Sequence, residues 1–205
     1  GCKRPTSSNS YYRTFTKPNA HPQASGIEHV EPHAIVANDG TRTEIDTLVL
    51  ATGFDLWEAN IPAVEIIGRD GRNLGKWWRE NRFQAYQGVS VPYFPNYLSL
   101  ASPYAFIGLN YFNTVEYQMR ILDRLLREVS ERGAQTFEVT EEANSRFLDQ
   151  MVEKVGDSVF AVGHCADARS YYFNPHGEAT LLRPATARAA IREASEFPMS
   201  DYKFA

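Results

Sequence analysis

The spacing of hydrophobic positions changes several times along this chain, and each change predicts a different element. Residues 1–26 carry few periodic apolar positions and many Pro, Ser, Thr and Asn, which predicts a loop with one short turn of helix. Strand patterns begin at Ile27. The segments 34–37 and 43–45 flank Asn-Asp-Gly at 38–40, a turn sequence that tolerates positive φ, so a β-hairpin is predicted there.

A short continuous apolar run follows the hairpin at 47–51 and predicts a strand that is covered on both faces. The run stops at Thr52-Gly53, where a residue without Cβ lets the backbone turn tightly or approach a ligand. Residues 56–103 hold many aromatic residues and prolines. They predict irregular, well-packed connecting structure with one short helix at 77–81.

The longest helical pattern lies in the second half of the chain. Asn113 is the predicted N-cap and Gly133 the predicted stop. Apolar residues repeat at helical spacing between them. They are Val115, Met119, Leu122, Leu125, Leu126 and Val129.

A second helix is predicted between Thr140, as N-cap, and Gly156. Its predicted buried face consists of Ala143, Phe147, Met151 and Val155. Short strands are predicted at 136–139 and 158–163, and a last helix at 185–196. The predicted fold class is therefore mixed α/β, with strands in the first part of the chain and a mainly helical portion after them.

Composition and charge exclude several classes of function. Of 205 residues, 43% are hydrophobic and 22% charged, as in soluble globular proteins. The net charge of −4 argues against nucleic acid as a partner. Because no apolar stretch approaches the roughly 20 residues of a spanning helix, no membrane partner is expected.

The two cysteines, Cys2 and Cys165, are too few for a disulfide framework or a cysteine-rich zinc site. This pattern favours a reducing cytoplasm, and we predict a cytoplasmic location. The chain begins Gly-Cys-Lys without an initiator Met or an apolar leader, so we expect it to be the carboxyl-terminal part of a longer protein.

Self-contained catalytic motifs are not found. The glycines at 68, 71 and 75 have the wrong spacing for a dinucleotide fingerprint and predict a pair of turns. No serine lies in a Gly-x-Ser-x-Gly elbow. His164, Cys165 and His176 lack the paired spacing of metal ligands, so no metal site is predicted.

Several short motifs acquire meaning when they are taken together. Each has a plain structural explanation by itself, such as solvated charges, a turn after a strand, or a loop anchor. They are Gly1-Cys2-Lys3-Arg4-Pro5, Val-Leu-Ala-Thr-Gly-Phe-Asp at 49–55, Tyr86-x-Gly88, Phe94-Pro95-Asn96 and Glu116-x-Gln118. In this order they resemble the Baeyer–Villiger and related class B flavoprotein monooxygenases. The resemblance covers the whole chain and corresponds to the carboxyl-terminal part of such an enzyme.

The resemblance implies an enzyme that uses FAD, NADPH and O₂ to oxygenate a ketone to an ester or lactone. Arg4 occupies the catalytic arginine position of the family. A guanidinium does not deprotonate, so it suits an oxygen-derived anion on the flavin. Lys3 lies where the family places a lysine near the 2′-phosphate of NADPH.

Further cofactor and substrate contacts are implied by the same resemblance. Thr52, Gly53 and Phe54 would form the return from the NADPH domain (residues 1–54) to the FAD domain (residues 55–205), close to the cofactor. Ser102 and Pro103 would lead toward a helix aimed at the flavin, with Ser102 replacing a glycine of the family. The substrate pocket would be bordered by Tyr104, Ala105 and Phe106. No pocket role is implied for residues 164–184.

The chain contains neither of the two Gly-x-Gly-x-x-Gly fingerprints nor the upstream active-site aspartate of the family. We therefore predict that the chain alone is inactive and binds neither cofactor. Two alternatives are oxygenation of a nitrogen or sulfur nucleophile, and a non-catalytic interaction module that pairs with another copy. A fragment of two domains would expose apolar patches, so self-association is expected.

Overall fold

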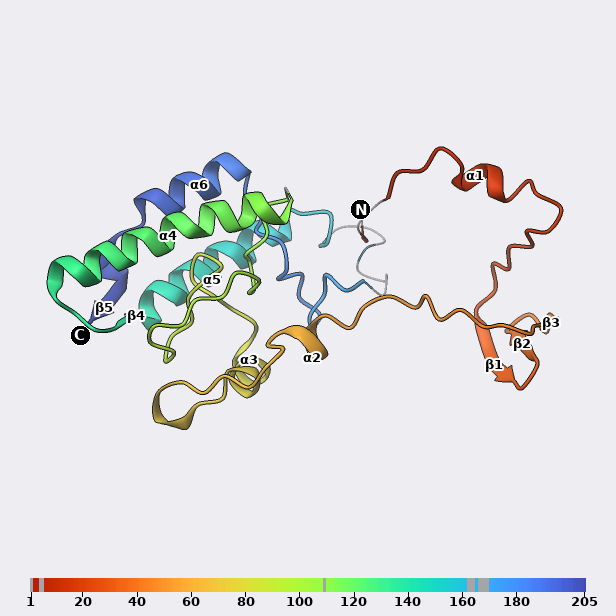
Figure 1. Ribbon diagram of the computed structural model, residues 1–205, viewed down its shortest axis with the longest axis horizontal. Coiled ribbons are helices and arrows are strands. Elements are labelled where there is room, and N and C mark those ends of the chain that lie inside the picture. Colours follow the sequence, from red (N-terminus) through yellow and green to blue (C-terminus); the bar gives the residue numbers. More distant parts are fainter. Residues whose placement is uncertain (1, 4–5, 109, 162–164, 166–169) are drawn as a thin grey trace. The chain divides into compact units, whose positions relative to one another are not determined.

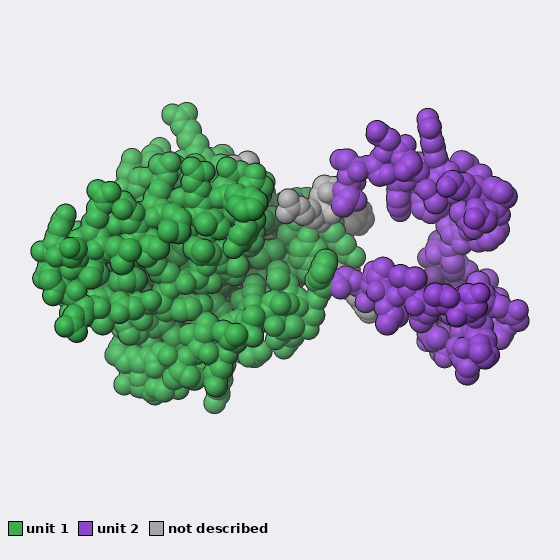
Figure 2. All heavy atoms as spheres, viewed as in Figure 1, with its two compact units in different colours: residues 1–3, 54–205 green, residues 4–53 purple. Residues whose placement is uncertain are grey.

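The computed structural model describes the chain apart from residues 1, 4–5, 109, 162–164 and 166–169. It contains two compact units, coloured separately in Figure 2. Unit 1 consists of Gly1–Lys3 and Phe54–Ala205, and unit 2 consists of Arg4–Gly53. The chain therefore leaves unit 1 after Lys3 and returns to it at Phe54. The assignment of residues 1–54 and 55–205 to two cofactor domains stays a prediction.

Unit 2 contains a short helix and a small antiparallel sheet (Figure 1). Its elements are α1 (Tyr11–Thr14), β1 (Ile27–Glu31), β2 (Ala34–Ala37) and β3 (Arg42–Glu44), with the strand order β1-β2-β3. Gly40 has a φ of 81°, and the Asp39 carboxylate accepts a hydrogen bond from the Thr41 amide at 2.9 Å. The predicted hairpin is confirmed.

The predicted buried strand at 47–51 is wrong. Residues 47–51 belong to no strand, and the side chains of Val49 and Leu50 are 79% and 77% exposed. A strand covered on both faces needs neighbouring strands and helices to pack against it. Among the described residues of unit 2, no strand pairs with this segment, so its apolar side chains stay in contact with solvent.

Unit 1 is mainly helical and has a two-stranded antiparallel sheet (Figure 1). Its elements are α2 (Trp57–Asn60), η1 (Arg69–Gly71), α3 (Leu74–Asn81), α4 (Tyr111–Arg132), β4 (Phe137–Val139), α5 (Glu141–Gly156), α6 (Ala187–Glu196), η3 (Met199–Asp201) and β5 (Tyr202–Phe204). One core lies among α4, α5, α6 and the sheet, and a second surrounds Trp57, Trp77 and Trp78. The coarse class, helices with small sheets, agrees with the prediction.

Helix α4 is longer than predicted, and its buried side matches the predicted one only in part: Leu125 is buried and Val129 packs against the core as expected. Its N-cap is Asn110, whose side chain accepts a hydrogen bond from the Asn113 amide, while Gly133 ends it in the left-handed conformation as predicted. Met119 and Leu126 are 43% and 51% exposed. The buried positions are Thr114, Tyr117, Gln118, Ile121 and Leu125. Thr114 and Gln118 are polar, so a search for apolar residues at helical spacing does not identify this side as buried.

The other elements follow the predictions with shifted ends. Thr140 caps α5 by accepting a hydrogen bond from the Ala143 amide, and β4 and α6 form as expected. The predicted strand at 158–163 is wrong for residues 158–161, which form turns, and its remainder lies outside the described residues. Strand β5 is not predicted, because it pairs with β4, which is far away in the sequence.

Candidate functional site

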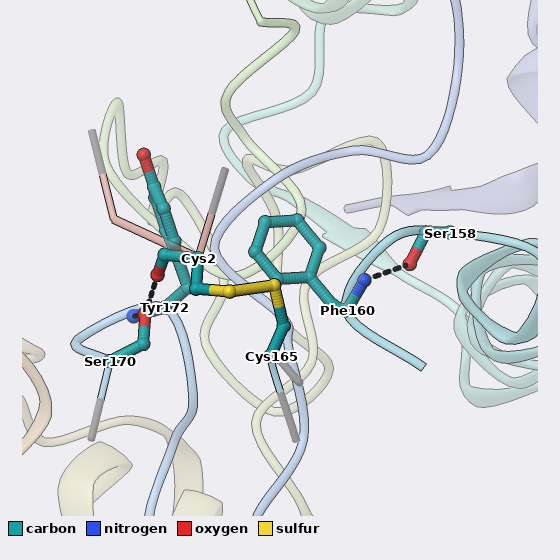
Figure 3. The surroundings of a disulfide bond; sticks show 6 residues. All are labelled: Cys2, Ser158, Phe160, Cys165, Ser170 and Tyr172. Carbon is teal, nitrogen blue, oxygen red and sulfur yellow. Dashed lines mark hydrogen bonds between the residues drawn. A yellow bond between two sulfur atoms is a disulfide. The ribbon is translucent and has the colours of Figure 1, made fainter. Parts of the chain in front are cut away.

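Lys3, the first of the two predicted cationic site residues, is the last residue of unit 1 before the chain leaves it. Lys3 is exposed and directly follows Cys2, whereas Arg4 lies outside the described residues. Cys2 forms a disulfide with Cys165, with a Cα–Cα distance of 5.0 Å (Figure 3). The two cysteines thus form one bond, which the expectation of a reducing environment does not anticipate.

The disulfide lies beside Ser170 and Tyr172. The Ser170 hydroxyl donates a hydrogen bond to the carbonyl oxygen of Cys2 and accepts one from the Tyr172 amide at 3.2 Å (Figure 3). Phe160 lies in the same surroundings, and its ring meets that of Tyr172 edge-on at 5.2 Å between centroids. Cys165 and Ser170 are 4% and 9% exposed, so both residues that hold Cys2 are buried.

The predicted return turn is open. Gly53 has a φ of 104°, which favours glycine, and a Cβ added there would meet no atom within 4 Å. Thr52 is exposed, and Phe54 is 84% exposed. The exposed ring of Phe54 and the open backbone at Gly53 leave this turn accessible to contact with another group.

Ser102 and Pro103 are buried inside unit 1. The Ser102 hydroxyl donates to the Gly88 carbonyl oxygen at 2.6 Å, and the Gln118 amide donates to the same oxygen at 3.0 Å. The hydroxyl is therefore engaged within the fold. The next helix, α4, begins only at Tyr111.

Tyr104 and Ala105 are buried at 2% and 0% exposure, and Phe106 is half-buried. Tyr104 borders a cavity of about 230 Å³ whose walls are mostly apolar and include Phe160. Burial, followed by the negative charge of Glu178, raises the pKa of Tyr104 to about 12. Tyr104 is therefore a neutral, fixed wall of a small cavity.

Lys3 belongs to unit 1 and Gly53 to unit 2, and each by itself has a feature suited to contact with a cofactor. Lys3 exposes an ammonium suited to a phosphate, and Gly53 leaves room for close approach. A pyrophosphate would also need glycine turns that this sequence does not contain. Across the described residues, no three His, Cys, Asp or Glu side chains gather as metal ligands, and His164 lies outside them.

Sequence reasoning missed Ser170 and the pairing of Cys2 with Cys165. A serine among aromatic residues carries no local signal, because its importance depends on a carbonyl group at the other end of the chain. Two cysteines without a third leave only one possible intramolecular pair, and this was the available signal for the disulfide.

Comparisons with known proteins agree with the fold and with the motifs. A Baeyer–Villiger monooxygenase from Streptomyces coelicolor is 31% identical over 205 residues, covering 99% of this chain and 38% of its own length. A Baeyer–Villiger monooxygenase from Pseudomonas aeruginosa is 31% identical over 176 residues, covering 85% of this chain and 32% of its own length. No family model matches.

Solved structures show the same fold. Cyclohexanone monooxygenase from Rhodococcus sp. Phi1 bound to NADP⁺ has a TM-score of 0.81 at 22% identity, over 99% of this chain and 39% of that protein. A complex of OTEMO with FAD and NADP has a TM-score of 0.78 at 21% identity, over 100% of this chain and 39% of that protein. A cyclohexanone-bound cyclohexanone monooxygenase has a TM-score of 0.79 at 24% identity, over 98% of this chain and 37% of that protein.

The match along nearly the whole chain places it among the monooxygenases, and the solved structures show that it shares their fold. Within that class the chain corresponds to part of a Baeyer–Villiger monooxygenase, which confirms the resemblance carried by the motifs. It spans 38% of the length of the Streptomyces relative. Across the described residues, no helix has the length and apolar character needed to cross a bilayer.

Proposed function

We propose that this chain is part of an enzyme that oxygenates a ketone with O₂, FAD and NADPH and forms an ester or lactone. The observation that carries the proposal is the match to Baeyer–Villiger monooxygenases along 99% of the chain. The structural neighbours bound to FAD, NADP and cyclohexanone support the choice of cofactors and of a small-molecule ketone.

The cationic pair Lys3-Arg4 is proposed to do the electrostatic work. Lys3, exposed and compact, would bind the 2′-phosphate of NADPH. Arg4 would stay charged throughout turnover and stabilise the negative charge that arises during oxygen transfer. Bound flavin supplies the redox chemistry with oxygen, while the residues of this chain orient NADPH and compensate charge.

The remaining predicted contacts are proposed on the same basis. The open backbone at Gly53, between Thr52 and the exposed Phe54, would approach the cofactor. The buried Ser102-Pro103 segment would act on the flavin site indirectly, by holding the surrounding loops in place. The Ser102 hydroxyl already donates to the Gly88 carbonyl oxygen and is therefore not free to contact the flavin. Tyr104, Ala105 and Phe106 would limit the size of the ketone, since Tyr104 and Ala105 are held rigidly in the core.

The test is Arg4→Ala in the complete enzyme. Product formation should fall by about 10²–10³, because one preorganised charge contact is lost, while flavin reduction by NADPH persists. Arg13→Ala, at an exposed position in α1, is the matched control and should leave turnover unchanged. Undiminished product formation in Arg4→Ala would contradict the proposal.

The choice between a ketone and a nitrogen or sulfur nucleophile is tested with the same preparation. Cyclic ketones and thioethers are offered separately, and the products are quantified. A dominant ester or lactone agrees with the proposal, and a dominant sulfoxide favours the heteroatom-oxygenating alternative.

A further inference from the structure

Cys2, the residue before Lys3, is held by two specific links within unit 1. Cys2 is bonded covalently to Cys165, and its carbonyl oxygen accepts a hydrogen bond from the Ser170 hydroxyl (Figure 3). Lys3 follows Cys2 directly, so the peptide bond that joins them starts from a residue held by both links. Its side chain remains exposed.

The segment that holds Cys2 is itself anchored to the core of unit 1. The indole N–H of Trp57 donates to the Tyr171 carbonyl oxygen at 2.9 Å, and Trp57 is 4% exposed. Its ring meets that of Phe83 edge-on at 4.9 Å between centroids. Trp57 follows closely on Phe54, where the chain returns to unit 1. Residues 170–171 therefore connect the departure point of the chain to the helix just after its return.

We propose that the Cys2–Cys165 disulfide, together with Ser170, positions Lys3 for NADPH, and that reduction of this bond lowers the affinity for NADPH. The inference rests on the proposed role of Lys3. Cys165 and Ser170 are positioning residues, because they act through the backbone of Cys2 and touch no cofactor themselves. Without the covalent link, a single hydrogen bond from Ser170 holds the Cys2 carbonyl, so Lys3 samples more positions.

Reduction of the disulfide needs a dithiol, and its reformation needs a peroxide. A thiolate of a dithiol attacks the half-buried Cys2 Sγ, Cys165 leaves as a thiolate and takes up a proton, and the second thiol of the reductant completes its own disulfide. Two electrons and two protons reach the protein as two thiols. A peroxide reverses the step: the two thiols become the disulfide, and hydrogen peroxide is reduced to two molecules of water.

The first measurement needs no turnover. Non-reducing digestion and mass spectrometry of the complete enzyme should yield one species that contains Cys2 and Cys165 joined. Tryptic cleavage after Lys3 should accelerate when dithiothreitol is added, because the segment loses its covalent link. The Cys2→Ser/Cys165→Ser variant should be cleaved at the faster rate with or without dithiothreitol. Two free thiols in the oxidised enzyme would overturn the inference.

The second measurement is a double-mutant cycle on NADPH binding. In the oxidised enzyme, Lys3→Ala and Cys2→Ser/Cys165→Ser should each raise the NADPH KM and the NADP⁺ Kd roughly tenfold or more, with kcat changed far less. Combining them should add little, because both remove the same positioned ammonium. Ser170→Ala should give a smaller rise in Kd, which dithiothreitol increases.

The outcomes separate this inference from the proposed function. If Lys3→Ala leaves Kd unchanged, the role of Lys3 is wrong and the inference is overturned with it. If Lys3→Ala weakens binding but the cysteine variant does not, or if the two effects simply add, the proposed function stands and the positioning role of the disulfide is overturned.

Discussion

Buried tyrosines make the stability of unit 1 depend on pH in the alkaline range. Burial is the largest cause that raises the pKa of Tyr86, Tyr104 and Tyr202, and for Tyr104 the value is about 12. Burial favours the neutral phenol. The Tyr86 hydroxyl also donates to the carboxylate of Asp201, and that of Tyr202 donates to Ser90 at 2.9 Å.

For a tyrosine with a raised folded pKa, the stabilisation is fully present below the unfolded pKa near 10 and is lost as pH rises through the folded value. We expect Tyr104 alone to remove on the order of 2–3 kcal/mol from the free energy of unfolding between about pH 10 and 12. Urea unfolding followed over this range tests it. Tyr104→Phe should flatten the decline, and Tyr12→Phe, at an 81% exposed position, should not.

At the scale of elements, the packing of two loops depends on Gly88. It has a φ of 71°, and an added Cβ would lie 2.6 Å from the Tyr104 carbonyl oxygen and 2.7 Å from the Ala105 Cα. Its own carbonyl oxygen accepts hydrogen bonds from Ser102 and Gln118. The glycine therefore allows the 86–90 turn to lie directly against the segment proposed to border the substrate.

Gly88→Ala should lower the free energy of unfolding by about 3 kcal/mol, because it combines a strained φ with a backbone collision. Gly133→Ala is the matched control: its φ of 62° is equally unfavourable, but no atom lies within 4 Å of the added Cβ. Its cost should be about 1 kcal/mol. Equal losses in chemical denaturation would show that the close approach at Gly88 contributes nothing.

At the scale of the whole chain, cofactor binding is the decisive property. The described residues supply an exposed ammonium and an open turn, but the sequence contains no glycine loop for a pyrophosphate. We expect the purified 205-residue chain to show no flavin absorbance and no saturable binding of NADP⁺ in calorimetry. Copurifying flavin would contradict this expectation.

The exposed apolar side chains predict self-association of the chain. Val49, Leu50 and Phe54 are 79%, 77% and 84% exposed, and such side chains favour contact with a second apolar surface. Light scattering should report a mass above that of a monomer, and Val49→Asp/Leu50→Asp should lower it. Thr43→Asp, at an exposed polar position, is the control. A monomer at all concentrations would rule out this expectation.

The cellular location is still a prediction, and its basis has changed. Two unpaired cysteines favour a reducing cytoplasm, whereas a disulfide persists more readily in an oxidising compartment. The Cys2–Cys165 bond removes the cysteine pattern as support for a cytoplasmic enzyme. The absence of a basic surplus remains the argument against a nucleic-acid partner.

Local sequence determined the features whose causes lie within a few residues. The hairpin at 38–40, the cap at Thr140 and the stop at Gly133 follow from turn and capping chemistry, and the ordered motifs identified the related enzymes. The tertiary structure decided which side of α4 is buried, the pairing of β4 with β5, and the bond between Cys2 and Cys165. These depend on groups that are distant in sequence and become neighbours only in the folded chain. For the same reason the apolar run at 47–51, which lacks partners among the described residues, does not form its predicted strand.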